Sequence, residues 1–143
     1  LSSSFFFCLS IYCEVEVSLK NVCMDHGCVK CCLDTEMPLL KDDVARIVGL
    51  GFKESFFSVK SGGFISLRNT DGRCVFHDGE KCTIYSGRPF GCRLYPVIFD
   101  VESNSPVIDK MCPFNVKFSL SFKVRNELSR LYHRLISERQ ASV

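Results

Sequence analysis

Ten cysteines in 143 residues constrain this chain more than any other feature of its sequence. Three of them form the cluster Cys28-Val-Lys-Cys31-Cys32. Two interpretations compete: a disulfide framework in an oxidising compartment, or thiolate ligands to a metal in a reducing one. The neighbours Cys31 and Cys32 cannot form a disulfide with each other without a strained peptide geometry. Because the cluster also gathers its sulfurs around one tight turn, the pattern favours a metal.

Seven cysteines are the predicted metal ligands: Cys28, Cys31, Cys32, Cys74, Cys82, Cys92 and Cys112. The spacing Cys28-x2-Cys31 lets two sulfurs bind one ion, and Cys74 and Cys82 frame a short hairpin that brings two more together. Soft sulfur ligands select zinc, an iron–sulfur cluster or Cu(I), so the expected cofactor is zinc or an iron–sulfur cluster. Seven thiols exceed the four that one ion or cluster uses. Either two metals bind, or some cysteines have packing or redox roles.

Arg88 and Arg93 flank Cys92 within the ligand-bearing stretch. Thiolates on zinc and cysteinyl iron–sulfur clusters are anionic, so we expect both arginines to offset that charge or to hydrogen-bond sulfur. Pro89 and Gly91 are expected to fix a loop in which the small glycine lets the backbone approach a cluster.

The remaining polar candidates have less support from their surroundings. His26 and His77 lie near Cys28 and within the Cys74–Cys82 turn, but a flanking histidine is more often a surface residue than a ligand. His133 and Cys23 are interpreted as structural, and Lys81, in a polar turn, as solvated.

The hydrophobic pattern predicts a small α+β domain. A helix is expected near residues 41–50, with Val44, Ile47 and Val48 facing the core. An amphipathic C-terminal helix is expected over residues 121–138, with the apolar stripe Val124, Leu128, Leu131 and Leu135. Short antiparallel strands are expected at 64–67, 74–76, 82–85, 97–101 and 107–108, whereas residues 52–59 fit either a strand or a helix.

Length and composition indicate one globular domain, because the chain is 46% hydrophobic and 24% charged. We expect residues 23–138 to form this domain. Residues 1–22 are either the remnant of a targeting sequence or translated upstream sequence, so Cys8 and Cys13 are excluded from the site. The apolar residues 1–13 are too few to span a bilayer, which takes roughly 20 residues. A net charge of +2 without a basic stripe argues against nucleic acid as a partner.

Several of these motifs together resemble one known family. The motifs are Cys28-Val-Lys-Cys31-Cys32, Cys74-Val-Phe76, Cys82-Thr-Ile84-Tyr85, Arg88-Pro89, Cys92-Arg93-x-Tyr95-Pro96 and Cys112-Pro113. They resemble the zinc- or iron-chelating domain family (YkgJ-like, Cys-rich CxxC(x)CC proteins) over about residues 28–114. The family is described as binding zinc or an iron–sulfur cluster, and its domain resembles part of flagellin lysine N-methylases. The resemblance implies a metal site carried by the seven cysteines, although many members have C-x2-C-x2-C-C where this chain has C-x2-C-C.

The sequence therefore predicts an intracellular metal-binding protein in a reducing compartment, either the cytosol or an organelle matrix such as that of a plastid. Its protein partner or substrate is unknown, and so is any catalytic residue. Whether it is an enzyme is open: the alternative is a cluster-dependent enzyme or enzyme subunit with methyl-transfer or redox activity. The chain has no Gly-rich nucleotide loop, no Ser/His/Asp set and no HExxH motif. A disulfide-stabilised secreted protein is the least favoured class.

Overall fold

The computed structural model describes residues 30–115 and 118–141. The predictions for residues 1–22 and for Cys8, Cys13, Cys23, His26 and Cys28 lie outside the described residues. Within the described ranges, no helix combines the length and the apolar character needed to cross a membrane.

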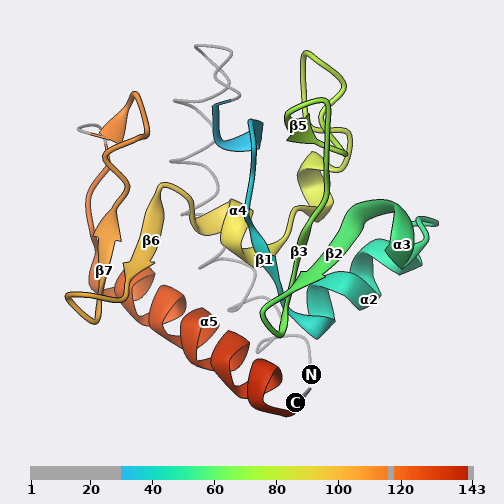
Figure 1. Ribbon diagram of the computed structural model, residues 1–143. Coiled ribbons are helices and arrows are strands. Elements are labelled where there is room, and N and C mark those ends of the chain that lie inside the picture. Colours follow the sequence, from blue (N-terminus) through green and yellow to red (C-terminus); the bar gives the residue numbers. More distant parts are fainter. Residues whose placement is uncertain (1–29, 116–117, 142–143) are drawn as a thin grey trace, which may run out of the picture.

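The described chain has an α+β fold with short antiparallel strands (Figure 1). Its α-helices are α2 (Lys41–Gly49), α3 (Glu54–Phe57), α4 (Phe90–Leu94) and α5 (Phe122–Ala141), and two 3-10 turns are η1 (Lys30–Cys32) and η2 (Tyr85–Gly87). Its strands are β1 (Pro38–Leu39), β2 (Ser58–Ser61), β3 (Phe64–Leu67), β4 (Asn69–Thr70), β5 (Arg73–Cys74), β6 (Val97–Asp100) and β7 (Ser105–Ile108). The predicted fold class, the helix near 41–50 and the C-terminal helix are confirmed.

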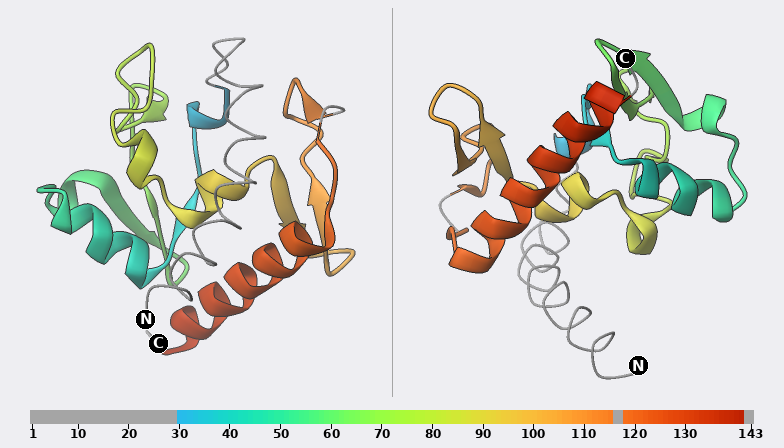
Figure 2. Two further views of the ribbon diagram at one scale, coloured as in Figure 1. Left: turned by 180° about the vertical axis from the view of Figure 1, so that it is seen from behind. Right: turned by 90° about the horizontal axis from the view of Figure 1, so that it is seen from below.

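The strands form one three-stranded sheet, in the order β1-β3-β2, and two separate hairpins, β4–β5 and β6–β7. The β4–β5 hairpin turns at Asp71 and Gly72, which have φ values of 54° and 77°. Two successive positive φ angles match the right-handed twist of the flanking strands, so an Asp-Gly pair suits this turn. Figures 1 and 2 show α5 running from the β6–β7 hairpin toward the start of α2, where Arg134 forms an ion pair with Asp42 at 2.6 Å.

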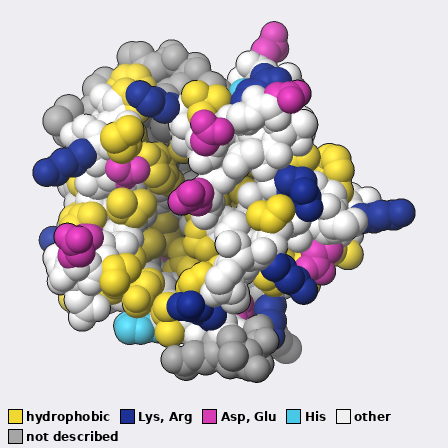
Figure 3. Space-filling model, in the orientation of Figure 1, with side chains coloured by type: hydrophobic (Ala, Val, Ile, Leu, Met, Phe, Trp, Pro, Cys, Tyr) yellow, Lys and Arg dark blue, Asp and Glu magenta, His cyan; other side chains and the backbone are white. Residues whose placement is uncertain are grey.

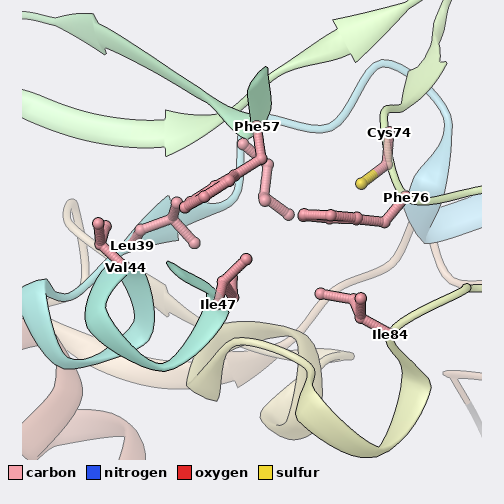
Figure 4. Packing of buried hydrophobic residues seen from close by; sticks show 8 residues of the cluster. Leu39, Val44, Ile47, Phe57, Cys74, Phe76 and Ile84 are labelled. Atoms are coloured by element: carbon pink, nitrogen blue, oxygen red, sulfur yellow. The ribbon is translucent and has the colours of Figure 1, made fainter. Parts of the chain in front are cut away.

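Two hydrophobic clusters stabilise these elements, and β1 leads into both. The first contains Leu39, Val44, Ile47, Phe57, Leu67, Cys74, Phe76 and Ile84 (Figure 4). The second contains Leu40, Leu94, Val97, Val124, Leu128, Leu131 and Leu135. Because successive side chains of an extended segment point in opposite directions, Leu39 enters the first cluster and its neighbour Leu40 the second. The predicted apolar stripe of α5 is therefore confirmed as a core face.

Two local predictions need correction, and one choice that the sequence left open is resolved. Val48 is 45% exposed instead of buried, and Asp43 occupies the inward face of α2 beside Val44 and Ile47. Residues 52–59 are resolved into α3 followed by β2. The strands predicted at 74–76 and 82–85 shrink to β5 and a single bridge between His77 and Cys82. Asp78 explains the last difference, because its Oδ1 accepts hydrogen bonds from Glu80 N and Lys81 N at 2.9 Å each. These bonds form a tight turn, so the two segments pair over a single bridge and not over a longer hairpin.

Candidate metal centre

Five predicted ligands come from four separate segments and meet beside the first hydrophobic cluster. Cys74 is buried in that cluster, and Cys32, Cys82 and Cys92 pack against it. A bridge between Leu33 and Arg73 and a 2.9 Å hydrogen bond from Asp34 N to Gly72 O hold the chain after η1 against the β4–β5 hairpin. The fold therefore brings the cluster at 31–32 to the sulfurs at 74, 82 and 92.

Cys31 and Cys32, the vicinal pair, differ in the pKa of their thiols. A hydrogen bond from the Cys32 thiol stabilises the Cys31 thiolate and lowers the pKa of Cys31 to about 7. The same hydrogen bond, together with burial and the nearby thiols, raises the pKa of Cys32. Cys31 is exposed whereas Cys32 is half-buried. The exposed member is thus also the more acidic of the two thiols.

The other thiols are held in their neutral forms when no cation is present. Burial raises the pKa of Cys74, Cys82 and Cys92, and the negative charges of neighbouring thiolates raise each of these values further. Arg88 acts in the opposite direction on Cys82 and Cys92. A bound cation would lower these pKa values, because a coordinating thiol is deprotonated by the metal. This set of soft sulfur ligands therefore fits zinc or iron in chemical type.

The thiols do not form a complete ligand shell as they stand. In the part of the chain that the structure describes, no group of three or more His, Cys, Asp or Glu side chains is arranged so that it could hold a metal ion. The predicted ligand Cys28 lies outside this part. The described thiols are thus gathered within electrostatic range of one another, and coordination requires a further local approach of the sulfurs.

Cys112 is buried and lies next to the site through Tyr95. The Tyr95 hydroxyl donates a 2.7 Å hydrogen bond to Asp109 Oδ2. Burial, this hydrogen bond and the charges of Asp109, Cys112 and Cys31 together raise the pKa of Tyr95. The charges of Cys112 and Cys31 thus both act on Tyr95, whereas Cys32, Cys74, Cys82 and Cys92 lie at the first hydrophobic cluster.

The two arginines next to Cys92 have different surroundings. The Arg88 charge helps to lower the pKa of Cys31, and its guanidinium stacks on the Tyr85 ring at 3.8 Å from the centroid. Arg93 donates hydrogen bonds to the carbonyl oxygens of Arg88, at 3.0 Å, and Ser86, at 3.3 Å. Arg88 therefore favours thiolates electrostatically, while Arg93 holds the loop that precedes Cys92.

Cys92 lies in α4, and its neighbour Gly91 has a different role from the predicted one. A Cβ atom at Gly91 would overlap the Met37 sulfur. The glycine therefore leaves room for the Met37 side chain, which packs against the first hydrophobic cluster. The segment around Cys92 is also a short helix instead of the loop expected from Pro89 and Gly91.

Asp43 is a fully buried carboxylate that sequence reasoning did not connect to the site. Its Oδ2 accepts a hydrogen bond from Leu40 N at 3.0 Å, and its Oδ1 accepts from Phe90 N and from Arg46 Nη2, both at 3.1 Å. Arg46 Nη2 in turn donates to Arg88 O at 2.7 Å. This pair joins the start of α2 to the start of α4 and so positions Cys92. The Asp-x-x-Arg spacing within a helix was the signal available in the sequence.

We expect Asp43→Asn to lower the free energy of unfolding by about 2 kcal/mol, because hydrogen bonds to a charged group contribute roughly 1.5–3 kcal/mol. Urea unfolding measures the change. Asp42→Asn is the matched control: its ion pair with Arg134, at 2.6 Å, joins two well-exposed side chains, so it should cost less than about 1 kcal/mol. Equal effects of the two substitutions would contradict the role assigned to Asp43.

A cavity of about 720 Å³ opens beside the site. Cys31, Met37, Gly91 and Tyr95 line one part of it, and the α5 residues Leu128, Leu131, Tyr132 and Leu135 line another. Figure 3 shows hydrophobic side chains gathered in a hollow on the corresponding face. Its size and apolar lining fall within the range of small-molecule sites in proteins.

The fold and the gathered thiols define a small, cysteine-rich α+β domain. Residues 22–113 match the CxxCxxCC family, described as "Putative zinc- or iron-chelating domain". The chain belongs to this family, which confirms the resemblance seen in the sequence. An 87-residue stretch is 32% identical to an uncharacterized protein of Methanocaldococcus jannaschii and covers 54% of this chain and 48% of that protein. The chain thus spans about half the length of this curated relative. No solved structure matches the chain.

Proposed function

We propose that this protein binds zinc or an iron–sulfur cluster through thiolates drawn from its seven predicted ligands. One observation carries the proposal: Cys32, Cys74, Cys82 and Cys92 come from four separate segments, yet all of them lie at the first hydrophobic cluster. Thiolates brought this close together repel one another unless a cation lies among them. The membership of the chain in a zinc- or iron-chelating family supports the same function.

The proposed centre assigns a role to each group around it. Cys31, whose pKa is lowered, would be the first ligand, and the buried thiol of Cys74 and the half-buried thiols of Cys82 and Cys92 would complete the set as thiolates. Arg88 offsets the negative charge of the assembled thiolates. When bound, zinc would stabilise the fold, whereas an iron–sulfur cluster would add one-electron chemistry. The proposal also places the protein in a reducing compartment, because the ligands must remain thiols.

Removal of the metal tests the proposal, because binding free energy of an assembled site becomes folding free energy. Free metal at about 100 times the Kd stabilises the folded state by about 2.7 kcal/mol. We therefore expect a chelator to lower the Tm by on the order of 10 °C, and addition of the metal to restore it. A melting curve that stays unchanged after verified metal removal would contradict the proposal.

A second candidate, a cluster-dependent enzyme or enzyme subunit, is favoured by the cavity. Catalytic metal sites keep one position open to substrate, whereas structural sites are closed by protein ligands. The cavity reaches Cys31, the exposed member of the vicinal pair, and so offers a small molecule a route to the proposed metal. An iron–sulfur chromophore in the purified protein would favour this candidate, and zinc would favour the binding module.

A further inference from the structure

His77 is a buried imidazole located between two of the proposed ligands. Its side chain is 93% buried, since only 7% of its surface is exposed. His77 N donates a 2.9 Å hydrogen bond to Cys74 O, and the residue pairs across an antiparallel bridge with Cys82. Residues directly opposite each other in an antiparallel pair project their side chains from the same face. The imidazole therefore shares a face with the Cys82 thiol.

The hydrogen bonds of His77 determine which of its nitrogen atoms carries the proton. Nδ1 accepts a hydrogen bond from Gly79 N at 3.1 Å, so in the neutral ring the proton is on Nε2. Nε2 is buried and has no hydrogen-bond partner among the described groups. A buried donor without an acceptor costs free energy, and nearly all such groups in folded proteins have a hydrogen-bond partner.

We propose that His77 Nε2–H donates a hydrogen bond to a metal-bound thiolate of this centre, that of Cys82. This inference rests on the proposed metal site, which supplies the anionic sulfur that the metal-free thiol lacks. It also excludes His77 as a ligand through Nε2. Ligation there would move the proton to Nδ1, where it would face the N–H of Gly79, so two donors would oppose each other. His77 is accordingly a positioning residue that strengthens a ligand.

The test compares wild type with His77→Leu, which is close in volume but cannot donate. Zinc affinity is measured by competition with a chromophoric chelator, and the ligand set by the visible spectrum of the Co(II)-loaded protein. We expect His77→Leu to bind zinc roughly 10–100-fold more weakly, as for loss of other hydrogen-bond partners of metal ligands, with an unchanged Co(II) band pattern. His133→Leu, which removes an exposed imidazole on α5, should match wild type.

Nitrogen NMR of the zinc-loaded wild-type protein reads the tautomer directly and does not depend on a variant folding. A protonated Nε2 and an unprotonated Nδ1 would support the inference, whereas a metal-bound Nε2 would overturn it. Equal zinc affinity of wild type and His77→Leu, or loss of a nitrogen ligand from the Co(II) spectrum of the variant, would also overturn it. Failure of the wild-type protein itself to bind zinc and Co(II) would instead overturn the proposed function, and the inference with it.

Discussion

Cys31→Ser and Cys92→Ser should each abolish stable metal binding. Both residues lie at the point where the thiols gather, Cys31 as the exposed thiolate and Cys92 as a half-buried thiol whose pKa burial raises. A serine hydroxyl is a hard, weakly acidic donor that does not replace thiolate on zinc or iron. The loss of affinity should therefore exceed the roughly 10–100-fold that removal of an outer hydrogen-bond partner costs.

Metal content per chain after gel filtration measures this prediction. Cys8→Ser is the control, because Cys8 lies in the segment excluded from the site, and it should retain the metal of the wild-type protein. Full retention of metal by both Cys31→Ser and Cys92→Ser would contradict the proposed ligand set. Loss of metal in the Cys8→Ser control would show that residues 1–22 take part in the site.

Among single truncations to alanine in the first hydrophobic cluster, Phe76→Ala should lower the free energy of unfolding the most. The ring is almost fully buried and contacts three other aromatic rings, among them Phe52 at 5.0 Å and Phe57 at 5.8 Å between centroids. Truncation of a buried phenylalanine to alanine costs about 3–5 kcal/mol, since it removes apolar burial and leaves a cavity. Figure 4 shows that Phe76 lies in this cluster beside Cys74.

The same substitution should also weaken metal binding. Phe76 O accepts hydrogen bonds from Thr83 N and Thr83 Oγ1, both at 2.8 Å, and so ties together the backbone on either side of the Cys74–Cys82 turn. Urea unfolding and zinc titration measure the two effects. Phe122→Ala, at a side chain that is 79% exposed, should change stability by less than about 0.5 kcal/mol. A Phe76→Ala protein within about 1 kcal/mol of wild type would contradict the role given to this ring.

Helical periodicity predicted α2 and α5, and cysteine spacing singled out thiols that the fold brings together at the first hydrophobic cluster. Apolar residues at helical spacing located α2 and α5, because each helix needs one apolar face to pack. The Asp-Gly pair of the β4–β5 hairpin is a signal of the same local kind, since such a pair adopts the positive φ angles that this turn requires. These are local signals, and local signals can be read from a single sequence.

The remaining features depend on contacts between distant residues. Asp43 resembles an ordinary acidic residue at the start of a helix, and only its hydrogen bond to Phe90 N, 47 residues away, reveals its role. Gly91 resembles a loop glycine until the position of Met37 is known. The difference in acidity between Cys31 and Cys32 likewise depends on their hydrogen bond and on burial by other segments. Neither spacing nor composition carries that information.

We propose that clustered thiolates of this chain hold zinc or an iron–sulfur cluster. The most direct measurement is anaerobic purification followed by visible absorbance and by quantification of zinc, iron and sulfide per chain. We expect either a colourless protein with stoichiometric zinc, or a brown protein with iron and sulfide in matching amounts. A colourless protein that contains neither metal in stoichiometric amount, and that takes up neither after reconstitution under reducing conditions, would contradict it.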